Sequence, residues 1–113
     1  MTRVRLPNRR AAETVDLEHG GQRFTVTVGF YPDGRPGEVF THGLRSGSNL
    51  DGLLADACIV VSCLMQHGVE PHEIASSMGR LGNTEPASII GAVIDFAATA
   101  ASPTSQNTEG AHQ

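Results

Sequence analysis

The residues best suited to chemistry lie between positions 33 and 49, where charged and hydroxyl side chains alternate with glycine. A guanidinium group and the free N–H groups at the start of a helix both attract anions. A nucleotide phosphate or another anion is therefore one ligand that this segment could bind. Helix capping, an Arg35–Glu38 ion pair and ordinary surface charge explain the same residues without a ligand, and we favour this structural interpretation. The residues concerned are Asp33, Arg35, Glu38, Arg45, Ser46, Ser48 and Asn49.

No catalytic, metal or cofactor motif accompanies this cluster. His67 and His72 are the closest pair among the five histidines, but Pro71 interrupts the helical spacing that would place both on one metal. The sequence contains no G-x-S-x-G, P-loop or G-x-G-x-x-G pattern. We therefore expect no catalytic residue, no bound metal and no cofactor.

The two cysteines, Cys58 and Cys63, fall within one predicted helix. Side chains five residues apart on a helix point about 140° away from each other, so this pair cannot form a disulfide within it. We expect both to be small buried side chains in a reducing compartment. Because no segment has the apolar run of a signal peptide or of a membrane span, we expect a cytoplasmic protein.

Charge is unevenly distributed along the 113 residues. Residues 1–10 hold four of the eight arginines and no acidic residue, whereas all twelve acidic residues follow, and the net charge is −4. Such a basic N-terminal arm either contacts an anionic partner or is a solvated terminus. We favour the solvated terminus and expect no nucleic-acid binding, because the arm lacks the aromatic side chains on which bases stack.

Three strands precede the helices. Residues 13–18 alternate, glycines follow His19, and residues 23–31 place Phe24, Val26, Val28 and Phe30 on one face, which is typical of an antiparallel strand with one covered face. Pro32-Asp33-Gly34 predicts a tight turn with a positive φ at Gly34. Residues 37–42 then form the third strand, so the sequence predicts a β-meander.

The spacing of apolar residues becomes helical from position 48. Leu50, Leu53, Leu54, Ala57, Val61 and Leu64 are expected to form the buried stripe of a long helix. Residues 58–65 are apolar on almost every side, so we expect protein to enclose them. His67-Gly68 ends this helix. A short helix is expected over 71–78 and a last one from Thr84 or Glu85 to about Ala100, followed by a disordered tail over 101–113.

These elements predict an α+β fold of two layers, with a three-stranded antiparallel meander followed by three helices, over residues 11–100. The over-apolar helix predicts an interface, either in a homo-oligomer or with another protein. The residues expected there are Ile59, Val60, Cys63, Ile90 and Val93.

Several spaced motifs carry a resemblance to a known family. They are Leu6-Pro7-Asn8-Arg9-Arg10, Thr27-Val28-Gly29-Phe30-Tyr31, Asp33-Gly34-Arg35-Pro36-Gly37-Glu38, Gly47-Ser48, His67-Gly68-Val69, Glu85-Pro86 and Ile94-Asp95-Phe96. In this order they resemble the TSCPD domain family, the small C-terminal domain of vitamin-B12-dependent ribonucleotide reductases.

The resemblance implies an accessory domain, with a ribonucleotide reductase as one partner to expect. It does not imply a reaction, because the reductase barrel, its radical-carrying cysteine, the B12-binding residues and the reducing Cys-x-x-Cys segment have no counterpart in these residues. We therefore expect a non-catalytic interaction domain. The alternative is a small regulatory domain that binds a nucleotide or an anion through the segment 33–49.

Overall fold

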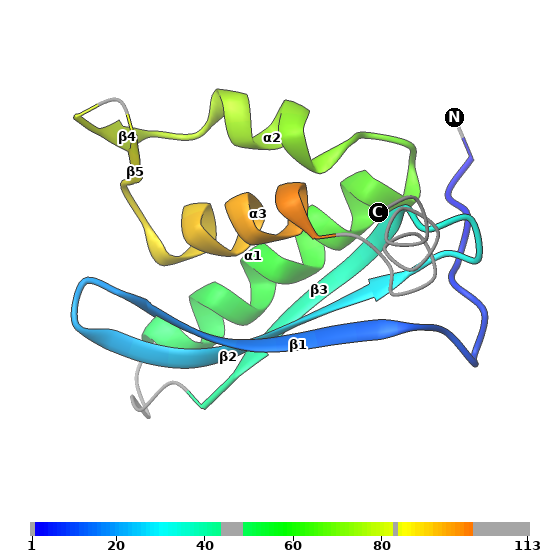
Figure 1. The fold of residues 1–113 in the computed structure, drawn as a ribbon, viewed down its shortest axis with the longest axis horizontal. Helices are drawn as coiled ribbons and strands as arrows, with labels where there is room; N and C mark the ends of the chain where they lie inside the picture. The colour runs from blue at the N-terminus through cyan, green and yellow to red at the C-terminus, as the bar shows by residue number, and fades with distance from the viewer. Residues whose placement is uncertain (1, 44–48, 83, 101–113) are drawn as a thin grey trace, which may run out of the picture.

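The computed structural model describes residues 2–43, 49–82 and 84–100. It confirms the α+β fold, a three-stranded antiparallel sheet followed by three helices, and adds a small β-hairpin (Figure 1). None of the helices in the described ranges is long and apolar enough to cross a membrane. In chain order the elements are β1 (Ala12–His19), β2 (Gln22–Phe30), β3 (Pro36–His42), α1 (Asn49–Gln66), α2 (Pro71–Ser77), β4 (Arg80–Leu81), β5 (Glu85–Pro86) and α3 (Ile89–Thr99).

Two glycine-containing turns set the register of the meander. Gly20 and Gly21 have φ angles of 58° and 81°, the conformation of a two-residue hairpin that matches the twist of the strands it joins. The predicted positive φ of Gly34 is confirmed at 95°, and the Gly34 amide donates to the Tyr31 carbonyl. The resulting strand order is β1-β2-β3, with Leu17 opposite Phe24 and Val28 opposite Val39.

The core lies between one face of the sheet and the helices. The predicted buried side chains of β2, Phe24, Val26, Val28 and Phe30, are all at most 3% exposed. Figure 1 shows α1 and α3 over this face, with α2 packed on the far side of α3. The other face of β2 was expected to be open, yet it is partly covered as well.

The N-terminal arm, residues 2–10, is bound to the sheet and to the end of α1. The Val4 carbonyl accepts a hydrogen bond from the Tyr31 hydroxyl, and the Val4 amide donates to the Gln66 carbonyl at 2.8 Å. Arg3 Nε donates to Gln66 Oε1 at 2.6 Å, and Arg10 Nε donates to Glu38 Oε2 at 2.6 Å. The side chains of residues 2–10 are exposed except for that of Leu6, as expected of a solvated terminus, but the backbone and two arginines of this arm are also hydrogen-bonded to the end of α1 and to the sheet.

The buried face of α1 is rotated from the predicted one. Leu54, Cys58, Val61 and Met65 face the core, whereas the predicted core residue Leu53 is 68% exposed. Polar bonds to β3 fix this rotation: Ser62 Oγ bonds both the amide and the carbonyl of Val39, at 3.0 and 3.2 Å. Within this chain, residues 58–65 are not enclosed on every side, because Ile59 and Val60 are exposed. The enclosure expected for them would therefore require a second protein.

The last helix begins later than predicted. Instead of starting a helix, Glu85 and Pro86 form β5 and pair with β4, because proline disfavours helical backbone at the residue before it. α3 begins at Ile89, where the Ser88 hydroxyl accepts the Gly91 amide at 3.0 Å. The predicted short helix is confirmed as α2, with Pro71 in its first turn and a capping box formed by Glu70 and Glu73.

Candidate functional site

The predicted ligand-binding cluster is divided by a strand. Asp33 and Arg35 lie in the turn before β3, whereas Asn49 begins α1 beyond the other end of β3. A seven-residue strand spans about 20 Å, so the described residues at its two ends do not share a ligand. Arg45, Ser46 and Ser48 lie outside the described residues, as does the side chain of Asn49.

The basic group of the turn already has partners. Arg35 Nε lies 2.8 Å from Asp33 Oδ2, and its guanidinium carbon lies 4.7 Å from the centre of the Tyr31 ring. Hydrogen bonds from the Arg35 backbone and side chain lower the pKa of Asp33 below its usual value. The predicted Arg35–Glu38 pair is wrong: Glu38 points to the outer face of the sheet, where it binds Arg10.

The hollow beside this turn is also lined by acidic side chains. It has a volume of about 270 Å³ and lies between the turn, the start of α2 and the end of α3. Glu70 contributes a second carboxylate next to Asp33, and His72 Nδ1 lies 3.7 Å from Glu70 Oε1. An anion here would have to compete with Asp33 for Arg35, so the described geometry does not favour anion binding.

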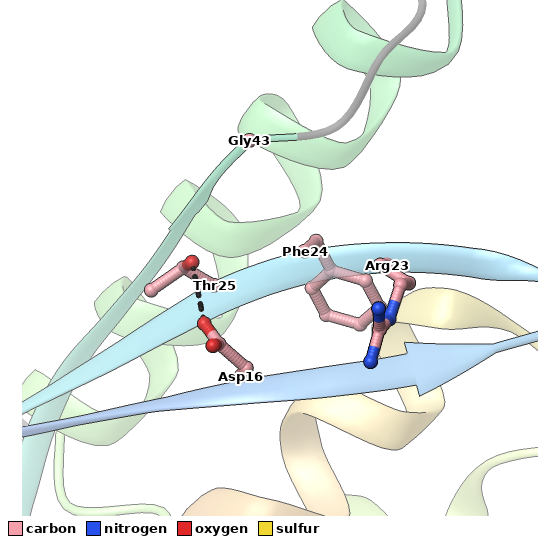
Figure 2. Close-up of a pocket in the computed structure, with 5 residues that line it drawn as sticks. All are labelled: Asp16, Arg23, Phe24, Thr25 and Gly43. Carbon is pink, nitrogen blue, oxygen red and sulfur yellow. Dashed lines mark hydrogen bonds between the residues drawn. The ribbon is translucent and has the colours of Figure 1, made fainter.

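A polar hollow at the other end of the sheet also escaped the sequence analysis. Figure 2 shows Asp16, Arg23, Phe24, Thr25 and Gly43 around it, and its volume is about 290 Å³. Thr25 Oγ1 donates to Asp16 Oδ1 at 2.9 Å across the β1–β2 pair (Figure 2). The Phe24 side chain is turned into the core, and the charged groups of this hollow are one carboxylate and one guanidinium.

The most apolar candidate is a groove between β3 and α1, which we call the β3/α1 groove. Its volume is about 360 Å³. Two large apolar side chains border it in exposed positions: Phe40, 42% exposed, and Ile59, 60% exposed. The residues that line it are Arg3, Glu38, Val39, Phe40, Thr41, Ala55, Cys58, Ile59, Ser62, Cys63 and Gln66. Phe40 was not identified as a site residue from the sequence. The strand order that places β3 at the edge of the sheet cannot be read there.

The polar groups of the β3/α1 groove are already engaged. Ser62 binds the Val39 backbone, and the Gln66 side chain donates to the Gly37 carbonyl at 2.9 Å. Burial raises the pKa of the Cys58 thiol, although a hydrogen bond with Thr41 acts in the opposite direction. Cys58 is therefore protonated at neutral pH, and the thiol is a poor nucleophile. The groove is chemically suited to receive apolar side chains.

The five predicted interface residues are in different environments. Ile59 and Val60 are exposed, and Cys63 is partly exposed on the groove. Ile90 is partly buried against the core. Val93 is fully buried, so it belongs to the core and does not lie on any outer surface of this chain. Exposed Leu53, which was assigned to the core, lies instead on the outer side of α1.

The parts of the chain that the structure describes contain no group of three or more His, Cys, Asp or Glu residues arranged to hold a metal ion. They also contain no fully buried side-chain nitrogen or oxygen without a hydrogen-bond partner.

Comparison with known proteins identifies a family and several relatives. The TSCPD domain family matches residues 2–100. A vitamin B12-dependent ribonucleotide reductase of Rhodopirellula baltica is 39% identical over 67 residues, which are 59% of this chain and 6% of that protein. The protein of the same name in Agrobacterium fabrum is 30% identical over 88 residues, 78% of this chain and 7% of that protein. In Streptomyces coelicolor the values are 39% over 67 residues, 59% and 7%.

The chain thus corresponds to less than a tenth of the length of these three relatives. No solved structure gives a significant match.

Proposed function

The chain belongs to the TSCPD domain family, and we propose that it is a non-catalytic accessory domain that binds another protein through the β3/α1 groove. The observation that carries this proposal is the pair of exposed apolar side chains, Ile59 and Phe40, on a groove whose polar groups are already hydrogen-bonded. A partner can therefore bury apolar surface there without leaving a polar group unpaired.

Burial of this surface would contribute to the free energy of association. Burial of one such side chain stabilises a complex by about 1.5–3 kcal/mol, so Ile59 and Phe40 together supply a useful anchor. Anchors of this kind, apolar at the centre with polar groups at the rim, are typical of protein interfaces. Arg3 and Glu38 line the same groove and give it such a polar rim.

The partner we propose is a ribonucleotide reductase. The support comes from the relatives, in which the similar segment is a small part of a much longer protein named vitamin B12-dependent ribonucleotide reductase. In those relatives the segment belongs to the same chain as the rest of the reductase. We propose that this chain binds a separate reductase chain through the β3/α1 groove. We do not propose nucleotide or anion binding, because Arg35 is paired with Asp33 and the described part of the predicted cluster is divided by β3.

The test is binding of the purified reductase from the same organism to the immobilised chain. Ile59→Glu places a charge on the groove and should weaken binding at least about tenfold, the equivalent of 1.4 kcal/mol. Leu81→Glu is the matched control, since Leu81 on β4 is 61% exposed and Ile59 is 60% exposed. Absence of binding by the wild-type chain, or equal weakening by both variants, would contradict the proposal.

A further inference from the structure

A second apolar surface on α1 has no role in the β3/α1 groove. It consists of Leu53, Ala57, Val60 and Leu64, which we call the outer stripe. Leu53, Val60 and Leu64 are 68, 59 and 39% exposed, and Ala57 is partly exposed. Their separations of four, three and four residues follow the heptad pattern by which one helix packs on another. α1 therefore has two apolar faces, and its own core covers only one.

The described residues leave this stripe uncovered. Outside the described residues, the sequence contains only two large apolar side chains, Met1 and Leu44. A membrane surface is also a poor match. Helices that lie on membranes carry Lys or Arg beside their apolar face, whereas α1 has no basic residue and carries Asp51 and Asp56.

We propose that the outer stripe packs against the outer stripe of a second copy of this chain, with the two α1 helices antiparallel. In this register Ala57 faces Val60 of the second copy, a small side chain against a larger one, and Leu53 faces Leu64. The stripe is then complementary to itself, as a two-fold interface requires. Antiparallel helices also place their dipoles in opposite directions.

The charges beside the stripe fit the same arrangement. Asp56 flanks the stripe on the side of Cys63. In the antiparallel register Asp56 lies closest to Cys63 of the second copy. The two Asp56 residues are then offset along the helix axis by about five residues, which is roughly 7.5 Å. The interface thus brings no two carboxylates together, so the apolar contact is not opposed by local repulsion.

The strength of the dimer follows from its size and from the charge of the chain. A contact along three helical turns is smaller than the roughly 800 Å² per partner of a standard stable interface, so we expect a dissociation constant on the order of 10–100 μM. Each copy carries a net charge of −4. Because salt screens the repulsion between the two copies, the dimer should become tighter as ionic strength rises. This inference uses a different face of α1 and does not depend on binding to a reductase.

Sedimentation equilibrium from about 5 to 500 μM tests the proposal. The wild-type mass should rise from 11.9 kDa to twice that value, and the rise should begin at lower concentration in high salt. Val60→Glu should remain monomeric, whereas Leu81→Glu, an exposed control on β4, should dimerise like the wild type. Because Val60 is exposed, the Val60→Glu variant should fold like the wild type. Its circular dichroism spectrum checks this. A wild-type chain that stays monomeric throughout, or a dimer that Val60→Glu does not weaken, would overturn the proposal.

Cross-linking tests the orientation separately. In a Cys63→Ser background, chains carrying Ala57→Cys and chains carrying Val60→Cys are mixed and mildly oxidised. An antiparallel pair should give the mixed disulfide, while Val60→Cys alone should cross-link more slowly. In a parallel pair, Val60→Cys chains would cross-link with one another faster than with Ala57→Cys chains, and this result would refute the antiparallel arrangement. Binding to the reductase is measured on other variants, so either proposal can fail while the other stands.

Discussion

Arg80 and Asp95 form a two-pronged ion pair, with Nη1 2.6 Å from Oδ2 and Nη2 2.6 Å from Oδ1. Arg80 lies in β4 and Asp95 in α3, and Nη2 also donates to the carbonyl of Ala75 in α2 at 3.2 Å. The hydrogen bonds with Asp95 raise the pKa of Arg80 further above its usual value. One guanidinium group thus joins α2, β4 and α3.

Replacement of Arg80 by lysine should lower the melting temperature. A lysine side chain keeps the charge but cannot make the paired hydrogen bonds that hold Asp95 and the Ala75 carbonyl together. The matched control is Arg35→Lys, since Arg35 and Asp33 form an ion pair in which both side chains are more than half exposed. Such exposed pairs contribute little to stability. Thermal unfolding that is equally affected in both variants would show that the Arg80 pair has no special structural role.

Gly37 should not tolerate a side chain. A Cβ atom at this position would lie 2.5 Å from Cε2 of Tyr31 and 3.0 Å from a methyl group of Leu6. Tyr31 is only 6% exposed and its hydroxyl is bound to Val4, so the ring has little room to move. We expect Gly37→Ala to lower the free energy of unfolding by about 1–3 kcal/mol, measured by urea denaturation.

Gly52 is the matched control for that substitution. It lies on the exposed side of α1, and a Cβ atom there would have no neighbour within 4 Å. Alanine is the better helix former, so Gly52→Ala should raise the free energy of unfolding by about 0.5–1 kcal/mol. If both alanine variants shift stability in the same direction, the steric explanation for Gly37 is wrong.

The sheet could be predicted well because its signals are local. Alternation along β2 identified Phe24, Val26, Val28 and Phe30 as core residues, and the structure buries all four. The turn at Gly34 was likewise predictable, since its positive φ depends on residues next to it.

The orientation of α1 could not be predicted in the same way. With apolar residues on most of its circumference, the pattern allows several rotations, and long-range bonds decide among them. Ser62 and Gln66 fix the choice through the backbone of β3, more than twenty residues away in the chain. Leu53 was consequently assigned to the core, although it is exposed.

The candidate site was predictable only in part. Ile59 was predicted as an interface residue, and the structure places it, exposed, on a groove that exists only because β3 lies beside α1. Asp33 and Asn49 were grouped because they are near in sequence, whereas the intervening strand separates them. Docking of the arm was missed because it depends on single contacts such as the one between Arg3 and Gln66.

Ser62→Ala should weaken the attachment of α1 to the edge strand β3. The substitution removes both hydrogen bonds to Val39 and leaves its amide without this partner, at an expected cost of about 1–3 kcal/mol. Hydrogen exchange should become faster at the Val39 amide in particular. A general loss of packing would instead speed up exchange at many amides. The control is Ser76→Ala, because the exposed Ser76 hydroxyl bonds only the Glu73 carbonyl at 2.8 Å among the bonds described. Unchanged exchange at Val39 would contradict this prediction.

The two thiols should differ strongly in reactivity. Cys58 is 2% exposed and burial raises its pKa, whereas Cys63 is partly exposed. Because alkylation requires the accessible thiolate, iodoacetamide at neutral pH should modify Cys63 first and reach Cys58 only when the domain opens. Mass spectrometry after timed quenching measures both rates. In concentrated urea the two rates should become similar, and equal rates in the folded protein would contradict the burial of Cys58.

The raised pKa of Cys58 also predicts how stability depends on pH. The thiol ionises at a lower pH in the unfolded chain than in the folded one, so the unfolded state loses its proton first. The free energy of unfolding should therefore fall as pH rises above the ordinary thiol pKa of about 8.5, and this contribution should stop falling above the folded pKa. Cys58→Ala lacks this group, so its stability should decline less steeply than that of the wild type between about pH 8 and 10. Urea denaturation across this range measures both slopes, and parallel slopes would show that the folded and unfolded states ionise Cys58 alike.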